Sequence, residues 1–448
     1  MVVMGRRRVG KTFLINNAFE GDFVFKLTGS KDQTNAEQLT NFAHEISDRL
    51  GLETPTPANW SEAFRLLGKY LDSLPATSRL VAFIDELPWL DKAKSRFLPA
   101  FEYFWNHYGS SKRNLLLIVA GSSASWMHKK IVKNKGGLFD RQAAIMTIHP
   151  FRLLETEQFL QKKGISWSRM DIVRLYMVTG GVPFYLDAID PERTLNENID
   201  FLIFRKDGGL RREFDRLFDT LFKRKEGHLS VVNALAKTRY GMTRKGLSEA
   251  TGLAYNGALS EILESLEQCG FVTAYVNYGE RKEERYYLSD FFSQFYLRFV
   301  RGKRGLDEHF WSNSFQSPSR RAYEGIAFEF ICLAHVAQIK ESLSIGGVLA
   351  EEFAWKARGE DEKAGTQIDL VISRKDSTAT ICEMKFSETE FTIDKGYDET
   401  LRNKVARYGE FSEHRKSIQL VLITTYGLKK NIYSNLVSRV LTLDDLFK

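Results

Sequence analysis

The chain of 448 residues carries 64 Lys and Arg against 57 Asp and Glu, which gives a formal net charge of +7 at pH 7. Its hydrophobic share of 43% and charged share of 27% are typical of a soluble globular protein. The length predicts roughly two to four domains. No apolar run approaches the roughly 18 residues of a membrane helix and no signal peptide is found, so a cytoplasmic protein without membrane contact is expected.

The three cysteines, Cys269, Cys332 and Cys382, are far apart in the sequence. Their spacing fits neither a zinc site nor a disulfide framework, and it agrees with a reducing compartment. The excess of positive charge permits contact with DNA or RNA.

The first motif lies at the N-terminus, where residues 5–12 read Gly-Arg-Arg-Arg-Val-Gly-Lys-Thr. Its two glycines let the backbone wrap a polyphosphate so that successive N–H groups point at the oxygens. Lys11 is expected to contact the β- and γ-phosphates, and the Thr12 hydroxyl to bind Mg²⁺. A predicted strand before the loop and a predicted helix after it support ATP binding. The residues predicted to bind ATP are Gly5, Arg6, Arg7, Arg8, Val9, Gly10, Lys11, Thr12 and Phe13.

A second motif lies at residues 79–86, where an apolar run predicts a buried strand that ends in two carboxylates. Asp85 is expected to hold Mg²⁺ through water, and Glu86 to polarise the attacking water. The alternative is an N-cap for the following helix. The helices predicted at 37–50 and 63–74 separate this strand from the phosphate loop and favour the catalytic interpretation.

A third strand is predicted at residues 114–121, and it ends in Ser122 and Ser123. One of these serines, with Ser123 preferred, is expected to sense the γ-phosphate; the alternative is an N-cap for the helix near Trp126. Arg141 follows a Gly-Gly loop and is a candidate arginine finger, although a salt bridge explains it equally well. A finger that acts on a neighbour's ATP would require an ATP-dependent oligomer.

These three motifs, together with Gly180-Gly181-Val182-Pro183, resemble the AAA+/STAND-type P-loop ATPases of prokaryotes. The resemblance implies an α/β fold, with a parallel P-loop NTPase sheet over residues 1–150 and a helical lid over 151–204. In that family the Gly-Gly-x-Pro turn opens the lid after a small helical segment, here 157–178. Relatives usually carry a further segment before the first strand, which helps to form the adenine side of the site. Here the loop begins four residues after Met1, so either the start is truncated or the base is held differently.

Residues 205–300 predict a winged helix, which the resemblance also places after the lid. Three helices at 229–237, 243–250 and 258–268 precede a hairpin whose strands are 271–276 and 284–288. The third helix exposes Glu261, Glu264 and Glu267, which would repel phosphates. Basic residues gather instead near the second helix and the wing. The module is therefore either a DNA contact made by the wing or, preferably, a domain interface that moves with the nucleotide state.

The pattern changes to α/β again after about residue 318. Residues 367–372 and 379–385 predict two strands joined by a turn at 375–377. Strand periodicity puts Glu383 and Lys385 on one face, and closure of the hairpin would bring Asp369 close to them. Two carboxylates and a lysine are the minimum for Mg²⁺-assisted phosphodiester hydrolysis, with Asp369 and Glu383 as metal ligands and Lys385 orienting or activating water. The alternative is solvated surface charge.

This C-terminal pattern, over residues 318–448, resembles the PD-(D/E)xK nuclease superfamily. The matching residues are Asp369, Glu383-Met384-Lys385 and the helical Glu329, for which Glu324 is the alternative. Arg402 and Lys404, on a later helix, stand where relatives often place basic helpers. Members of the superfamily include both active nucleases and binding modules.

The sequence thus predicts a P-loop ATPase with ATP and Mg²⁺ as cofactors, coupled to a C-terminal nuclease-like domain that acts on DNA or RNA. Two rival interpretations remain. In one, nucleotide locks a signalling or scaffold protein whose C-terminal domain binds a partner without cleavage. In the other, the winged helix serves a DNA-binding regulator.

Overall fold

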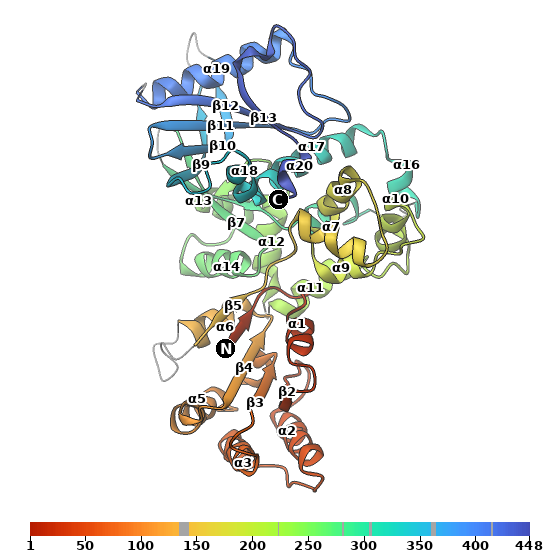
Figure 1. Ribbon diagram of the computed structural model, residues 1–448, viewed down its shortest axis with the longest axis vertical. Coiled ribbons are helices and arrows are strands. Elements are labelled where there is room, and N and C mark those ends of the chain that lie inside the picture. Colours follow the sequence, from red (N-terminus) through yellow and green to blue (C-terminus); the bar gives the residue numbers. More distant parts are fainter. Residues whose placement is uncertain (134–142, 223, 280–281, 304–306, 360–363, 414) are drawn as a thin grey trace. The chain divides into compact units, whose positions relative to one another are not determined.

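The computed structural model describes residues 1–133, 143–222, 224–279, 282–303, 307–359, 364–413 and 415–448. The chain divides into two compact units, Met1–His149 and Pro150–Lys448 (Figure 1). The loop with the candidate arginine finger Arg141 lies outside the described residues.

The first unit is built on a parallel five-stranded sheet in the order β2-β3-β4-β1-β5 (Figure 1). The interior strand β3 is buried along its whole length, as expected for a parallel strand covered on both faces. The strands are β1 (Val2–Met4), β2 (Phe23–Thr28), β3 (Leu80–Asp85), β4 (Leu115–Gly121) and β5 (Ile145–Thr147).

Helices cover both faces of this sheet. On one face Ile15 of α1 packs against Val3, Phe83 and Ile118. On the other, apolar residues of α2, α3 and α5 form a larger core with the sheet. The helices are α1 (Lys11–Ala18), α2 (Asn35–Leu50), α3 (Trp60–Ser73), α4 (Leu87–Leu90), α5 (Phe97–His107), η1 (Gly109–Ser111), α6 (Ala124–Met127) and η2 (His128–Val132). The predicted α/β class with a parallel sheet is therefore confirmed.

The second unit begins with helices and a short strand. Three of its helices have a side-chain N-cap, which accepts a hydrogen bond from an N–H of the first turn. The N-cap residues are Ser168 for α8, Thr243 for α13 and Asn256 for α14. The elements are α7 (Leu153–Lys162), α8 (Arg169–Thr179), α9 (Pro183–Asp187), α10 (Leu195–Ile199), η3 (Asp200–Phe204), α11 (Glu213–Leu221), α12 (Lys225–Leu235), β6 (Met242–Thr243), α13 (Arg244–Thr251), α14 (Gly257–Gln268) and α15 (Phe291–Phe299).

An eight-stranded sheet occupies the rest of this unit, in the order β13-β12-β11-β10-β9-β7-β8-β6 (Figure 1). Besides β6, its strands are β7 (Val272–Tyr278), β8 (Glu283–Leu288), β9 (Ala350–Ala357), β10 (Thr366–Arg374), β11 (Thr378–Lys385), β12 (Ser417–Thr424) and β13 (Val437–Leu441). The remaining helices are α16 (Phe310–Asn313), α17 (Pro318–Ala334), α18 (Val336–Ser342), α19 (Lys395–Phe411), η4 (Ser434–Leu436) and α20 (Leu443–Leu446).

One parallel contact joins the two halves of this sheet. Asn277 and Tyr278 of β7 pair with Ala354 and Trp355 of β9. The hairpin predicted as a wing therefore continues into the sheet of the C-terminal segment. Neither β9 nor this pairing is predicted from the sequence. β9 pairs along most of its length with the neighbouring β10, but its contact with β7 joins segments that are far apart in the chain.

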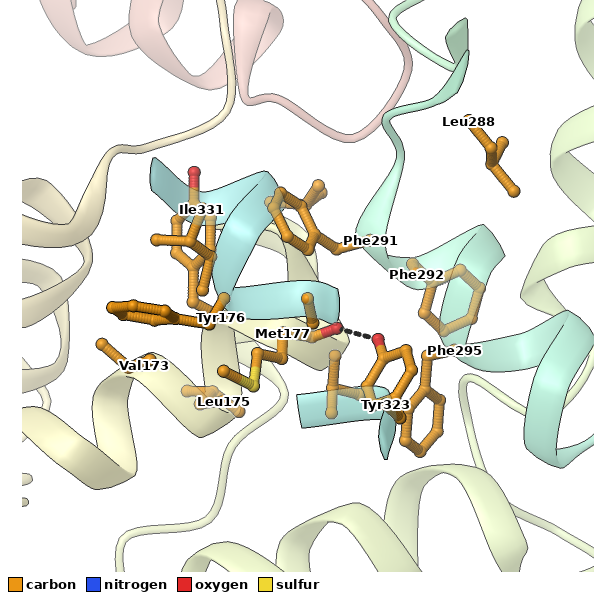
Figure 2. Close-up of a cluster of buried hydrophobic side chains, with 14 of the residues drawn as sticks. Val173, Leu175, Tyr176, Met177, Leu288, Phe291, Phe292, Phe295, Tyr323 and Ile331 are labelled. Carbon is orange, nitrogen blue, oxygen red and sulfur yellow. Dashed lines mark hydrogen bonds between the residues drawn. The ribbon is translucent and has the colours of Figure 1, made fainter. Parts of the chain in front are cut away.

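A shared core also joins the helices of the second unit. Figure 2 shows Tyr176 and Met177 of α8 beside Phe291 and Phe295 of α15, and Tyr323 of α17 donates a hydrogen bond to the Met177 carbonyl. The segment expected as one small helical piece at 157–178 forms two helices, α7 and α8, with Gly164 at positive φ between them. Within the part of the chain that the structure describes, no helix is long and apolar enough to cross a membrane.

Candidate functional site

The loop between β1 and α1 has a backbone shaped for an anion. Gly5, Arg8 and Gly10 have φ values of 151°, 76° and 85°. A Cβ on Gly5 would lie 2.3 Å from the Ile148 carbonyl oxygen, so only glycine fits there. The left-handed conformation of Arg8 costs an ordinary residue about 1–2 kcal/mol, which the surrounding fold must offset. Such a curved run of N–H groups ahead of a helix N-terminus is a typical phosphate site.

The side chains that follow the loop are placed for phosphate and metal binding. The Lys11 ammonium group donates to the carbonyls of Gly5 and Arg6, both at 2.8 Å, which keeps it buried inside the loop. The Thr12 hydroxyl donates to Asp85 Oδ2 at 2.5 Å. Hydroxyl and carboxylate oxygens are ligands that suit Mg²⁺, and here the two lie side by side at the foot of the loop. The residues therefore fit Mg²⁺-ATP.

Glu86 follows Asp85 in a left-handed conformation with φ of 47°. Its N–H donates to Asp85 Oδ1 at 2.8 Å, which fixes the Asp85 carboxylate. Glu86 Oε2 accepts two hydrogen bonds from Ser122, from the N–H at 3.1 Å and from the hydroxyl at 2.9 Å. The ends of β3 and β4 thus bring a carboxylate and a serine together beside the phosphate loop.

The two serines that the sequence left as alternatives have different positions. Ser122 contacts Glu86, whereas Ser123 precedes α6 as its N-cap residue without a side-chain capping bond. Phe13, in the first turn of α1, is 73% exposed. Arg141 lies outside the described residues.

A second group of charged residues lies in the second unit, where β10 and β11 run antiparallel. The last registered pair at this end of the two strands is Leu370 with Cys382, and the next residues outward are Asp369 and Glu383. A bulge between Ile368 and Val371 interrupts the pairing of β10 with β9 at Asp369. Bulges of this kind re-aim a side chain and are frequent next to functional sites.

Glu383 is buried and surrounded by donors. Lys404 Nζ lies 2.6 Å from Glu383 Oε2, Lys385 Nζ lies 3.3 Å from Oε1, and the Tyr397 hydroxyl donates to Oε1. Burial favours the neutral acid, but the two lysines and the hydrogen bonds outweigh it and lower the pKa of Glu383 below its usual range. Glu383 is therefore a charged carboxylate inside the fold. Burial and the charge of Glu383 raise the pKa of Tyr397.

Glu329 of α17 and Asp369 both lie near the Arg239 guanidinium. Arg239 comes just before the second helix predicted for the winged helix, at residues 243–250. Arg239 forms a two-pronged pair with Glu329, in which Nε donates at 3.1 Å, and its Nη2 is 3.9 Å from Asp369 Oδ2. Burial and the nearby Asp369 raise the pKa of Glu329 to about 7. Glu324, the alternative from the sequence, instead pairs with Arg320 and Arg174 in the core.

The acidic residues of this group can be compared with the ligands that a metal ion requires. Among the described residues there is no group of three or more His, Cys, Asp or Glu side chains placed to hold a metal ion. Mg²⁺, however, is usually bound by one or two carboxylates and several waters rather than by an all-protein cage. Asp369 and Glu383, the next residues outward on two paired strands, are the two carboxylates available for such a site, and Lys385 Nζ lies 3.3 Å from Glu383 Oε1.

Two members of this group carry no signal in the sequence. Arg239 comes from a turn after α12, far from any motif, and Tyr397 comes from the first turn of α19. Lys404, predicted as a basic helper, contacts Glu383, whereas Arg402 pairs with Asp398 at 2.9 Å.

Comparison with known proteins adds to the first of these two sites. Residues 1–189 match a family described as an ATPase domain predominantly from Archaea. The match covers all of the first unit and continues through α7, α8 and α9 of the second. The chain therefore carries a P-loop ATPase domain.

The chain is also similar to an uncharacterised protein of Methanocaldococcus jannaschii, with 23% identity over 395 residues, 87% of this chain and 83% of that protein. A Walker-type ATPase of Pyrococcus abyssi has a TM-score of 0.45 and 18% identity, over 66% of this chain and 90% of that one. A STAND protein of Pyrococcus horikoshii with a tetratricopeptide-repeat sensor has a TM-score of 0.29 and 16% identity, over 77% and 47%. With TM-scores below 0.5, neither solved structure assigns a substrate or partner to this chain.

Proposed function

We propose that this protein is a Mg²⁺-dependent ATPase whose second unit carries a nuclease-type site for DNA or RNA. The observation that carries the second half is a charged group in which Glu329 and Asp369 share one guanidinium and Lys385 lies 3.3 Å from Glu383, with Asp369 and Lys385 near enough to Glu329 for their charges to affect its pKa. These residues come from a helix and two strands that are separate in the sequence.

In the first unit, the loop N–H groups and Lys11 would hold the phosphates of ATP. Thr12 and Asp85 would hold Mg²⁺, which when bound neutralises charge on the phosphates. Glu86 is the base that would accept a proton from the attacking water. Ser122 would position it, because the two hydrogen bonds from Ser122 fix one carboxylate oxygen of Glu86.

In the second unit, Asp369 and Glu383 would hold Mg²⁺, which when bound polarises a phosphodiester. Lys404 and Tyr397 keep the Glu383 carboxylate ionised and oriented. Lys385 would orient the attacking water or stabilise charge on the phosphate, since its ammonium group is 3.3 Å from Glu383 and not fully buried. Arg239 would have to release Asp369 or Glu329 when a metal binds.

The proposed coupling rests on α7, α8 and α9. These helices belong to the segment that matches the ATPase family, yet they pack in the core of the second unit. Figure 2 shows this packing for α8. The contacts run from α8 to α17 through the Tyr323 hydroxyl and through Arg174, whose guanidinium is 3.5 Å from Glu324. A nucleotide-driven movement of these helices would therefore move the helix that carries Glu329.

Two assays on the full chain test this function. Phosphate release from ATP should fall at least about 100-fold in Lys11→Ala, because a charge that stabilises the transition state is lost. Lys69→Ala, an exposed lysine on α3, is the matched control. An unchanged rate in Lys11→Ala would remove Lys11 from the proposed role.

Cleavage of mixed DNA and RNA substrates in Mg²⁺ or Mn²⁺ tests the second site. The proposal expects metal-dependent cleavage that is lost in both Asp369→Asn and Lys385→Met and retained in Asp376→Asn, an exposed acid in the β10–β11 turn. Products in the absence of metal, or equal cleavage by all four proteins, would contradict it.

The rival is a switch in which the second unit binds a partner without cleavage. The observation that favours it is the pairing of each acid with a protein cation, Glu329 with Arg239 and Glu383 with Lys404. No cleavage under any metal condition, together with nucleotide-dependent partner binding, would support the rival.

A further inference from the structure

A cavity of about 240 Å³ lies where the β7–β8 hairpin, α17 and strands β9 and β10 meet. One wall is mainly aromatic and aliphatic, and the other carries charged and amide side chains. ATP binding does not use this cavity, and the proposed phosphodiester hydrolysis uses only its acidic side, at Glu329 and Asp369. Its lining residues are Arg239, Tyr240, Thr273, Tyr275, Tyr287, Glu329, Phe330, Leu333, Val336, Glu352, Phe353, Ala354, Gln367, Asp369 and Leu370.

The aromatic wall is rigid. The rings of Tyr287 and Phe330 stack with centroids 5.0 Å apart and an angle of 12°, and Tyr275 meets Tyr287 edge to face at 5.6 Å. At the rim, Tyr240 is 41% exposed, while its carbonyl accepts hydrogen bonds from Tyr275 and Arg285. The backbone of the rim is therefore fixed independently of the Tyr240 ring.

The polar wall is part of the proposed nuclease site. Glu329 and Asp369 line the cavity, and the Gln367 amide donates to Asp369 Oδ1 at 3.0 Å. Arg239, whose guanidinium lies 5.1 Å from the centre of the Tyr240 ring, stands between the aromatic and the acidic side. A guanidinium fork has five N–H groups and suits phosphate oxygens.

We propose that this cavity binds one unstacked nucleotide of a single-stranded DNA or RNA, with its base against the aromatic wall and its phosphate at Arg239. The inference rests on the proposed nuclease function and gives that site its substrate class. Aromatic side chains hold single-stranded bases by stacking, in a way that tolerates any base sequence.

Size decides between a single strand and a duplex. The cavity is smaller than the roughly 300–1,000 Å³ of pockets for drug-sized ligands, so it has room for one ring system and not for a stacked pair. A base inside a duplex would first have to leave its stack and its partner, which costs a few kcal/mol. A strand that is already single carries no such cost.

The test measures binding of the full chain to a DNA pentanucleotide with one 2-aminopurine, and to its RNA counterpart. Ca²⁺ replaces Mg²⁺, and product analysis checks that no cleavage occurs. The single strand should bind about tenfold or more tightly than the same sequence in a duplex. Ala354→Phe, which fills the cavity from β9, and Tyr240→Ala, which removes the rim ring, should each weaken binding about tenfold.

Tyr255→Ala is the matched control. Tyr255 is also an exposed tyrosine beside an arginine, with Arg244 4.4 Å from its ring centre, and it does not line the cavity. Its loss should leave binding unchanged. Equal affinity for single strand and duplex, or equal affinity of the Ala354, Tyr240 and Tyr255 variants, would overturn the proposal. Tyr240→Ala keeps the proposal testable if Ala354→Phe fails to fold.

The two proposals fail in different ways. If Asp369→Asn abolishes cleavage while Ala354→Phe cleaves single strands at the wild-type rate, the nuclease stands and the nucleotide cavity is wrong. If Tyr240→Ala and Ala354→Phe both weaken the binding of single strands but no strand is ever cleaved, the nucleotide cavity stands and the nuclease proposal is wrong.

Discussion

The phosphate loop of the first unit and the charged group of the second are assembled in opposite ways. The loop, residues 5–12, sets its own geometry through positive φ angles and lies next to the ends of β3 and β4. The second group draws its side chains from positions between Arg239 and Lys404, and its arrangement depends on strand register and helix packing. The phosphate loop is therefore local in sequence, although Asp85, Glu86 and Ser122 join it only when the unit folds, whereas the second group as a whole exists only when distant segments fold together.

Their electrostatics differ as well. In the first site Asp85 and Glu86 accept hydrogen bonds from Thr12 and Ser122, which are neutral donors. In the second, Glu329 and Glu383 are paired with Arg239 and Lys404, which are cations. A metal ion bound at the second site must therefore displace Arg239 or Lys404 from the acids or share the acids with them. At the first site a metal ion would replace only neutral donors.

The largest expected effect concerns Glu86. Glu86→Gln keeps the shape and can still accept the Ser122 hydrogen bonds, but it removes the base, so ATP turnover should fall about 10²–10⁴-fold. Binding of ATP should remain, measured by fluorescence of a labelled nucleotide. Glu53→Gln, in an exposed loop, is the control, and normal turnover in Glu86→Gln would break the assignment of the first site.

The dependence of the second site on packing can be tested at Arg320. This guanidinium is fully buried on α17 and bonds Glu324 at 3.0 Å and the Trp311 carbonyl at 2.9 Å. Arg320→Ala leaves a buried carboxylate poorly compensated and should lower the free energy of unfolding by about 3–5 kcal/mol. Denaturant unfolding followed by tryptophan fluorescence measures it.

Arg321→Ala changes the next residue of the same helix, which is exposed, and should cost less than about 0.5 kcal/mol. Equal stabilities for the two variants would show that the core beneath Glu329 does not depend on this ion pair.

The link between α7 and α17 should be pH-dependent through His335. Its ring accepts a hydrogen bond from the Leu153 N–H at 3.1 Å and donates to the Ile331 carbonyl at 2.8 Å, so it is neutral. Burial lowers the pKa of His335 to about 4. Above pH 6.5 the ring is neutral in both the folded and the unfolded chain, so its full contribution to the free energy of unfolding is present. Between pH 6.5 and 4 only the unfolded chain takes up the proton, and the free energy of unfolding falls by roughly 3 kcal/mol.

His335→Gln preserves both hydrogen bonds without a titrating ring, and it should remove this part of the loss. Glu329, whose raised pKa of about 7 makes the folded protein gain stability as pH falls, titrates in the same range, so the informative quantity is the difference between wild type and His335→Gln. His44→Gln, on the exposed side of α2, is the control. Parallel pH profiles for wild type and His335→Gln would refute the role of this histidine.

The smallest effect separates the two serines after β4. Ser122→Ala removes the hydroxyl that holds Glu86 and should slow ATP turnover about tenfold, the equivalent of one hydrogen bond to a charged group. Ser123→Ala should change turnover less than about twofold, since this side chain does not cap α6. A larger loss of turnover in Ser123→Ala than in Ser122→Ala would contradict this assignment and favour Ser123 as the γ-phosphate sensor, as preferred from the sequence.

The contrast between the sites explains what the sequence could predict. Gly5 to Thr12 and Asp85–Glu86 are recognisable because a fixed spacing encodes a local shape and a strand end. The choice between Ser122 and Ser123 depended on which side chain β4 turns toward Glu86, and spacing alone does not decide that.

In the second unit, alternation placed Glu383 and Lys385 on one face, and the turn at 375–377 placed Asp369 near them. Arg239, Tyr397 and the strand β9 escaped prediction because their partners are more distant in sequence or unmarked by any motif. Register and helix packing, which bring these residues together, are properties of the folded chain.

The most direct test of two separate sites is a Mn²⁺ titration of the full chain with and without a non-hydrolysable ATP analogue. Mn²⁺ favours the same oxygen ligands as Mg²⁺, and its bound and free forms differ in their electron paramagnetic resonance signal. The account predicts one class of bound Mn²⁺ that needs the nucleotide and is lost in Asp85→Asn, and a second that needs no nucleotide and is lost in Asp369→Asn. A wild-type protein that binds no Mn²⁺ without nucleotide would contradict the second site.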